Sequence, residues 1–170
     1  MSAAILFEMQ PKLAVLNSVL AALGVEPKID TVADRKRLQK AVYLGQVIAG
    51  VNLGYRFGWY LKGPYSRSLA KDYYDLAEAL AVGDHPNGYG LRSEDQVRAL
   101  KAASGLFRVP QGVNLSDADW LELVGSIDYL RRVSHKDEPN VDRVIHEQKR
   151  DLAQYLDQGK NALQEYARPQ

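Results

Sequence analysis

Histidine, cysteine and carboxylate side chains most often carry catalysis or bind metals, and this sequence places few of them in recognisable patterns. The chain has no cysteine, which removes disulfides, thiolate metal ligands and a cysteine nucleophile. Its three histidines, His85, His135 and His146, lie far apart in the sequence. His146-Glu147 begins like a zincin motif, but Arg150 stands where that motif needs a second histidine. The sequence therefore predicts no metal site.

Loops that could hold a phosphate or present a nucleophile are also incomplete. Gly83 and Gly88 have phosphate-loop spacing, but Tyr89-Gly90 replaces the lysine and hydroxyl residue that such a loop requires. Gly63-Pro64-Tyr65-Ser66 lacks the flanking glycines of a nucleophile elbow. Glu147-Gln148-Lys149 has the acidic-x-lysine ending of a nuclease site, but its surroundings predict an amphipathic helix rather than a strand. We expect a non-enzymatic protein without a cofactor, and an enzyme with a dispersed site is the third alternative.

The strongest chemical signal is a basic segment between Thr31 and Lys71. It holds eight lysines and arginines against one aspartate, Asp34, in a chain whose formal net charge is +1. Such a segment on a near-neutral protein is typical of a face that binds nucleic acid or an acidic protein. The candidate binding residues are Arg35, Lys36, Arg37, Lys40, Lys62, Tyr65, Arg67, Lys71 and Tyr74.

The position of three of these cations also favours a role in binding rather than in helix stability. Arg35, Lys36 and Arg37 fall in the first turn of a predicted helix, where the helix dipole disfavours positive charge. Local helix stability does not explain them. The aromatic side chains of residues 55–65 could stack on bases, but a core between a strand and its flanking helices is the favoured interpretation.

The elements that must position these residues are mostly helices. Apolar spacing predicts helices over residues 13–23, 34–49 and 67–81, from 93 to about 107, from 116, from 139 to beyond 156, and a shorter tail over 162–167. Residues 55–61 predict a short extended segment, and residues 82–92 predict a hairpin that turns near Asn87-Gly88. The predicted fold class is mainly α with a small β-hairpin.

This order of elements is compatible with a winged-helix layout. The helix from Arg67 would be the recognition helix, and residues 84–88 would form the tip of the wing. That tip is not basic, which weakens the case for DNA binding. We expect a single domain over residues 1–170, with a winged-helix-like core at 31–92 and a C-terminal helical segment at 116–166.

Two neighbouring motifs resemble a known family pattern. They are Arg37-Leu38-Gln39-Lys40-Ala41-Val42-Tyr43-Leu44 and, after Tyr55-x-Phe57, the run from Tyr60 through Gly63-Pro64-Tyr65-Ser66 to Leu69. The pattern is similar to that of the phage-associated YwgA-like proteins and, more distantly, of the Panacea (SocA-like) antitoxin domains. Arg37 stands for the first lysine of that pattern and Ala41 for its second leucine. The resemblance implies a bacterial or phage protein that acts by protein contact, often beside toxins or defence systems.

Composition limits where the protein acts. Hydrophobic residues make up 46% of the 170 residues and charged residues 25%, which are ordinary values for a packed globular domain. Residues 1–7 are too short and lack the basic start of a signal peptide, and no apolar run is long enough to cross a membrane. We therefore expect a soluble cytoplasmic protein, without a membrane partner. Its partner would be a protein or, in the alternative, nucleic acid, and a homodimer is compatible with the sequence.

Overall fold

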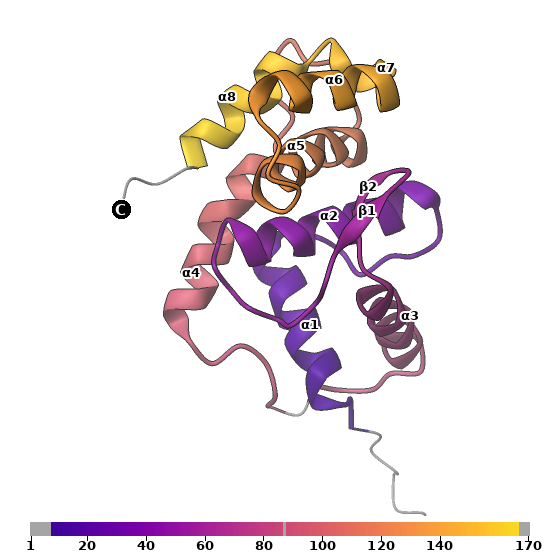
Figure 1. The fold of residues 1–170 in the computed structure, drawn as a ribbon. Helices are drawn as coiled ribbons and strands as arrows, with labels where there is room; N and C mark the ends of the chain where they lie inside the picture. The colour runs from indigo at the N-terminus through magenta and orange to yellow at the C-terminus, as the bar shows by residue number, and fades with distance from the viewer. Residues whose placement is uncertain (1–7, 87, 167–170) are drawn as a thin grey trace, which may run out of the picture.

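The computed structural model describes residues 8–86 and 88–166 (Figure 1). Within them the chain forms α-helices, one short 3-10 helix and a two-stranded antiparallel hairpin. The predicted fold class is therefore confirmed. The prediction that residues 1–7 are not a signal peptide concerns a segment outside the described residues. In that described part no helix combines the length and the apolar character needed to cross a membrane.

The first helix, α1 (Pro11–Leu23), covers the predicted range 13–23 and begins two residues earlier. Pro11 occupies the first turn, and Gly24 ends the helix in the left-handed conformation with φ 72°. Leu16, Val19 and Leu20, on its apolar side, are fully buried. α1 thereby becomes one wall of the first hydrophobic core.

The second helix, α2 (Val32–Val47), crosses the centre of the molecule, with α5–α8 on one side and α1 and α3 on the other (Figure 1). It begins two residues earlier than predicted because Thr31 and Asp34 form a reciprocal capping box. Leu38, Ala41 and Val42 enter the core shared with α1 and α3. Tyr43 and Leu44 enter a second core with α5 and the helices after it. α2 is thus the wall that the two cores share.

The hairpin lies before the third helix. Strands β1 (Gly58–Tyr60) and β2 (Gly63–Tyr65) pair with Trp59 opposite Pro64, and Gly63 adopts φ +94°. Ser66 then caps α3 (Arg67–Ala81), which matches the predicted range 67–81, by accepting a hydrogen bond from the Leu69 amide. The extended segment predicted over 55–61 is therefore one arm of the real hairpin.

The hairpin predicted over 82–92 is wrong. Apart from Asn87, which lies outside the described residues, this segment forms only an isolated bridge between Glu8 and His85. The backbone of this segment forms hydrogen bonds with α1 and the residues before it. The His85 carbonyl accepts from the Met9 amide, and the Leu91 amide donates to Ser18 Oγ. Since the described chain has no hairpin after α3, the wing predicted at 84–88 is wrong as well.

A fourth helix, α4 (Glu94–Ala103), begins at Ser93 as predicted and packs on α1. Its last turn tightens into the 3-10 helix η1 (Ser104–Phe107), which ends where the helix was predicted to end. The next helix, α5 (Asp117–Arg132), is capped by Ser116 and packs along α2. Trp120, Leu123 and Ile127 are among its fully buried side chains. α5 is the centre of the second core.

The single long helix predicted from residue 139 to beyond 156 is wrong, because the chain breaks at Lys149. It forms α6 (Glu138–Gln148), the short α7 (Arg150–Ala153) and α8 (Leu156–Tyr166). Lys149 leaves helical geometry, with φ −136° and ψ 56°, and turns its ammonium inward. The predicted tail, 162–167, belongs to α8 up to Tyr166, and Ala167 lies outside the described residues.

Candidate binding site

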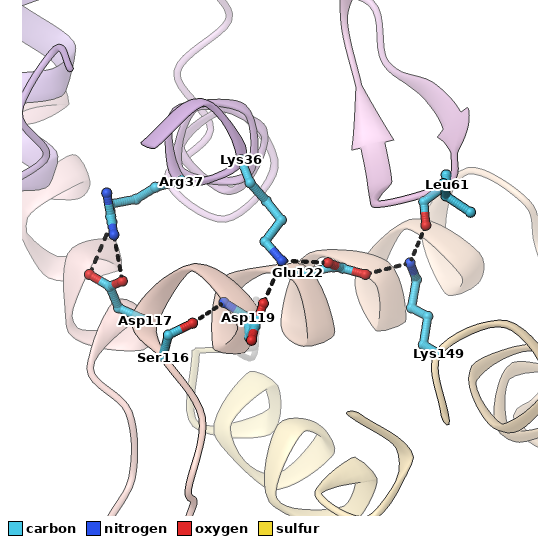
Figure 2. A network of polar contacts seen from close by, with 8 residues as sticks. All are labelled: Lys36, Arg37, Leu61, Ser116, Asp117, Asp119, Glu122 and Lys149. Carbon is cyan, nitrogen blue, oxygen red and sulfur yellow. Dashed lines mark hydrogen bonds and ion pairs between the residues drawn. The ribbon is translucent and has the colours of Figure 1, made fainter. Parts of the chain in front are cut away.

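Helices α2 and α5 are joined by buried charges (Figure 2). Lys36 Nζ donates to Asp119 and, at 2.8 Å, to Glu122 Oε1. The second carboxylate oxygen of Glu122 accepts from Lys149 Nζ at 2.7 Å, and Lys149 also donates to the Leu61 carbonyl at 3.1 Å. Glu122 thus bridges two lysines whose side chains are only 8% and 1% exposed. The network connects α2, α5, the hairpin turn and the break between α6 and α7.

The charges of Lys36 and Arg37 form ion pairs with carboxylates of the same chain. Arg37 forms a two-pronged pair with Asp117, at 3.0 Å and 2.8 Å, and also contacts Asp34. The Arg37 guanidinium lowers the pKa of the Asp117 carboxyl. Burial lowers the pKa of Lys36, but its hydrogen bonds to Asp119 and Glu122 outweigh burial and leave that pKa raised. Because α2 begins at Val32, Lys36 and Arg37 lie in its second turn and not in the first turn predicted for them, and the structural reason for their position is pairing with α5.

Lys40 is buried without a carboxylate of its own. Its side chain is 1% exposed, and its Nζ donates to the Pro64 carbonyl at 2.9 Å. Burial lowers the pKa of Lys40 to about 7, and the nearby positive charges of Lys36, Lys62 and Lys149 lower it further, against the opposite effect of Glu122. This ammonium is therefore the least compensated charge in the interior around α2.

A pocket of about 180 Å³ opens beside Lys40, between α2, β2 and α3. We call it the α2–α3 pocket. It gathers six of the nine predicted binding residues: Arg35, Lys36, Lys40, Lys62, Tyr65 and Tyr74. Val32, Gln39 and Tyr73 complete the lining.

The lining of the α2–α3 pocket is cationic and aromatic. No aspartate or glutamate is among its residues. Arg35 donates one hydrogen bond, from Nη1 to the Ile29 carbonyl, at 2.7 Å. The side-chain amide of Gln39 forms two hydrogen bonds with the Ser66 backbone: Nε2 donates to the Ser66 carbonyl, and Oε1 accepts from the Ser66 amide. Tyr65 packs against Tyr60 with ring centres 5.0 Å apart, which ties the pocket wall to the hairpin.

The three other predicted residues do not line this pocket. Arg37 faces α5, and Lys71 pairs with Asp75 one turn along the exposed side of α3 at 2.7 Å. Arg67 lies exposed at the start of α3. The predicted face is therefore divided between a pocket, a helix interface and ordinary surface.

Sequence reasoning missed Val32, Gln39 and Tyr73 in the pocket, and Asp117, Asp119 and Glu122 as partners of the basic turn. A signal for the acidic group was present, since three carboxylates follow Ser116 within two turns of a predicted helix.

The core interpretation of the aromatic side chains agrees with the packing of Phe57 and Trp59 against the second core. Tyr60 differs, since it is 43% exposed.

A larger groove, of about 970 Å³, lies between α5 and α8, but its charges are already paired. Arg131 binds Glu138, Arg132 binds Asp128 at 3.0 Å, and Lys160 contacts Glu138 at 3.5 Å. In the α2–α3 pocket Lys36 is paired with carboxylates of α5, but Arg35, Lys40 and Lys62 form no ion pair with a described residue. It is therefore the better candidate for a binding site.

The candidate site gives no sign of metal chemistry, because the described residues contain no group of three or more histidine, aspartate or glutamate side chains that could hold an ion. Comparison of the chain with protein-family models, curated proteins and solved structures gives no match. The resemblance to the YwgA-like and Panacea families therefore stays a prediction.

Proposed function

We propose that this protein is a non-enzymatic adaptor that binds a protein partner through the surface around the α2–α3 pocket. The observation that carries the proposal is the combination of a cationic, tyrosine-lined pocket with an exposed apolar border. Two lining residues, Val32 and Tyr74, are 52% and 46% exposed. Leu61, which precedes the lining residue Lys62 in the hairpin turn, is 87% exposed, and Tyr60, whose ring packs on the lining residue Tyr65, is 43% exposed. Exposed aromatic and aliphatic groups around a polar pocket are typical of protein-binding surfaces.

The chemistry of this surface indicates what the partner offers. A cationic pocket without acidic lining complements a negative charge, and the exposed rim complements an apolar surface. The partner is therefore a protein that presents an acidic side chain among apolar ones. By the family resemblance, the setting is a cytoplasmic toxin–antitoxin or phage-defence system.

DNA binding is the second candidate, and the charges favour it less. Duplex binding depends on many exposed cations that displace counterions from phosphates. Here Lys36 and Arg37 pair with α5, and Lys71 pairs with Asp75. Lys62 and Arg67, both exposed near the pocket, are the cations that a phosphate backbone could reach.

Co-expression with the adjoining genes tests the adaptor proposal. We expect the protein to neutralise the toxic product of a neighbouring gene and to co-purify with it. Leu61→Asp should abolish both effects without changing stability, because Leu61 is 87% exposed. Val133→Asp is the matched control, since Val133 is 44% exposed at the end of α5, and it should keep both effects. Equal activity of the two variants would contradict the proposed surface.

Fluorescence anisotropy of a labelled duplex at about 50 and 200 mM salt tests the DNA alternative. The informative variant is Lys62→Glu/Arg67→Glu, because changes at Lys36 or Arg37 would break the contact between α2 and α5. Tight, salt-sensitive binding that this variant loses would overturn the adaptor proposal. Metal- or nucleotide-dependent turnover would overturn the non-enzymatic part and favour the third alternative, an enzyme.

A further inference from the structure

We propose that the α2–α3 pocket binds the carboxylate of a glutamate or aspartate side chain carried by the protein partner, with Lys40 and Arg35 as its counterions. The inference rests on the proposed function, because the pocket lies at the centre of the proposed docking surface. It adds the chemical group that is recognised and the residues that recognise it.

The first argument is the balance of donors and acceptors. A lysine ammonium has three donors and a guanidinium has five. Lys40 has one bond, to the Pro64 carbonyl, and Arg35 has one, to the Ile29 carbonyl. Since the pocket lining contains no carboxylate, these donors have no anionic acceptor within it. A carboxylate accepts up to about four hydrogen bonds and would supply the missing acceptors.

The second argument separates a carboxylate from a phosphate. Phosphates are typically held by backbone amides at a helix N-terminus. At the start of α3 the Leu69 amide is already bound by Ser66 Oγ, and the Ser66 amide is bound by Gln39. At the start of α2 the capping box binds the Asp34 amide. These three amides are occupied, and the charged and aromatic groups that line the pocket are side-chain cations and tyrosine rings, which suit a singly charged group on an apolar stem.

The third argument concerns proton uptake. Lys40 faces Glu122 and Ser126 from α5, Lys149 from the α6–α7 break, Lys62 from the hairpin turn and, on its own helix, Lys36. Burial and the lysines hold the pKa of Lys40 near 7, so at pH 8 most molecules carry a neutral amine. A carboxylate beside the amine raises that pKa, so binding above pH 7 takes up a proton. Affinity is then highest at about pH 5.5–6.5 and falls by up to about tenfold per pH unit above pH 7. It also falls towards about pH 4, where the ligand carboxylate takes up a proton.

NMR of the full chain, with labelled lysine Cε and Nζ and labelled tyrosine, tests the inference. The probe is N-acetyl-glutamic acid α-amide, with N-acetyl-glutamine amide as its neutral isostere and inorganic phosphate as the competing anion. We expect the acid, at about millimolar affinity and pH 6.5, to shift Lys40, Tyr65 and Tyr73, and the neutral amide to leave them unchanged. A response to phosphate but not to the acid, or no response to either, would overturn the inference.

Lys40→Met supplies the decisive variant, because it keeps the buried stem and removes the amine. We expect it to bind the acid probe at least about tenfold more weakly and to lose the pH dependence. Lys71→Met is the matched control, since the Lys71 side chain is 71% exposed outside the pocket, and it should bind like the original chain. Unchanged binding in Lys40→Met would also overturn the inference.

The outcomes for the two proposals are separable. The acid probe is titrated into the protein alone, so its binding does not require the partner. A partner that is neutralised while the probe leaves Lys40 unshifted refutes only the carboxylate pocket. Probe binding with no neutralised or co-purified partner refutes only the adaptor function.

Discussion

Replacing Glu122 by glutamine is the sharpest test of how the two halves of the fold are joined. The substitution keeps the size of the side chain and removes its charge. Glu122 is the carboxylate that Lys36 and Lys149 share, through one oxygen each. Lys36 keeps Asp119 as a second partner, whereas Lys149 keeps only the Leu61 carbonyl and the face of the Trp59 ring, 5.1 Å from its nitrogen. The variant therefore leaves a buried ammonium without its counterion.

The magnitude follows from burial. The three side chains of this bridge are 8%, 10% and 1% exposed, so solvent screens them little. Removing one partner of such a buried pair costs about 3–5 kcal/mol. That is a large part of the roughly 5–15 kcal/mol that stabilises a typical domain. With a slope of about 2 kcal/mol/M, the urea midpoint should fall by about 2 M.

Equilibrium urea unfolding at pH 7 measures this loss. Glu147→Gln is the control, because its pair with Arg143 joins side chains more than half exposed, and such pairs contribute at most about 1 kcal/mol. The double variant Glu122→Gln/Lys149→Met should recover part of the loss, since it removes the unpaired charge as well. A loss in Glu122→Gln no larger than in the control would refute the account of a charge-bridged interface.

Four further predictions concern the same region. Lys40→Met should stabilise the protein at pH 6, by up to about 5 kcal/mol, since the folded chain then no longer buries a charge. In the original chain the free energy of unfolding should rise from pH 7 towards 10.5, where the unfolded state binds more protons, and urea titrations should show that rise disappear in the variant. Gly63→Ala should cost about 2–4 kcal/mol in the same assay, because its Cβ would lie 2.6 Å from Ser126 Oγ at φ +94°. Tyr43→Phe should cost about 1.5–3 kcal/mol by removing the 2.7 Å bond from the buried hydroxyl to Asp128, measured by thermal and urea unfolding.

Local signals in the sequence predicted the helices better than the strands. Ser66, Ser93 and Ser116 each cap a helix by a hydrogen bond to the amide three residues on, a relation within reach of sequence reasoning. The sequence misplaces the hairpin because the residues near Gly88 have the composition of a hairpin turn. The pairing of Trp59 with Pro64 depends instead on a two-residue turn before Gly63.

The break at Lys149 was invisible to periodicity for a similar reason. Apolar spacing continues through residues 141–156, so the pattern predicts one helix. The cause of the break is tertiary, since Lys149 reaches Glu122 on another helix and a carbonyl in the hairpin turn. Partners distant in sequence override helix propensity here.

The charge asymmetry of the sequence illustrates the same limit. The basic segment was interpreted as a face for an external polyanion, and it does supply a cationic pocket. Yet Lys36 and Arg37 find their counterions in Asp117, Asp119 and Glu122 of α5. A basic cluster near the start of one helix and an acidic first turn in another therefore predict a contact between the helices as well as a binding face. Only the fold distinguishes these two outcomes.

Three lysines, Lys36, Lys40 and Lys149, lie around Glu122, whose carboxylate has two oxygens. Only two of the three ammonium groups can therefore bind an oxygen of their own, and the third needs another partner. Lys36 and Lys149 each take one oxygen of Glu122, so both are structural. Lys40 is left with the Pro64 carbonyl, a weaker partner for a charge, and burial lowers its pKa to about 7. If stability alone shaped this position, an apolar side chain of similar length would serve better below pH 7. A Lys40→Met chain that is more stable at pH 6 but no longer binds a carboxylate would mean that Lys40 lowers the stability of the fold and is needed for binding. A less stable Lys40→Met chain would mean instead that the amine holds β2 against α2, and the case for Lys40 as a binding residue would fall.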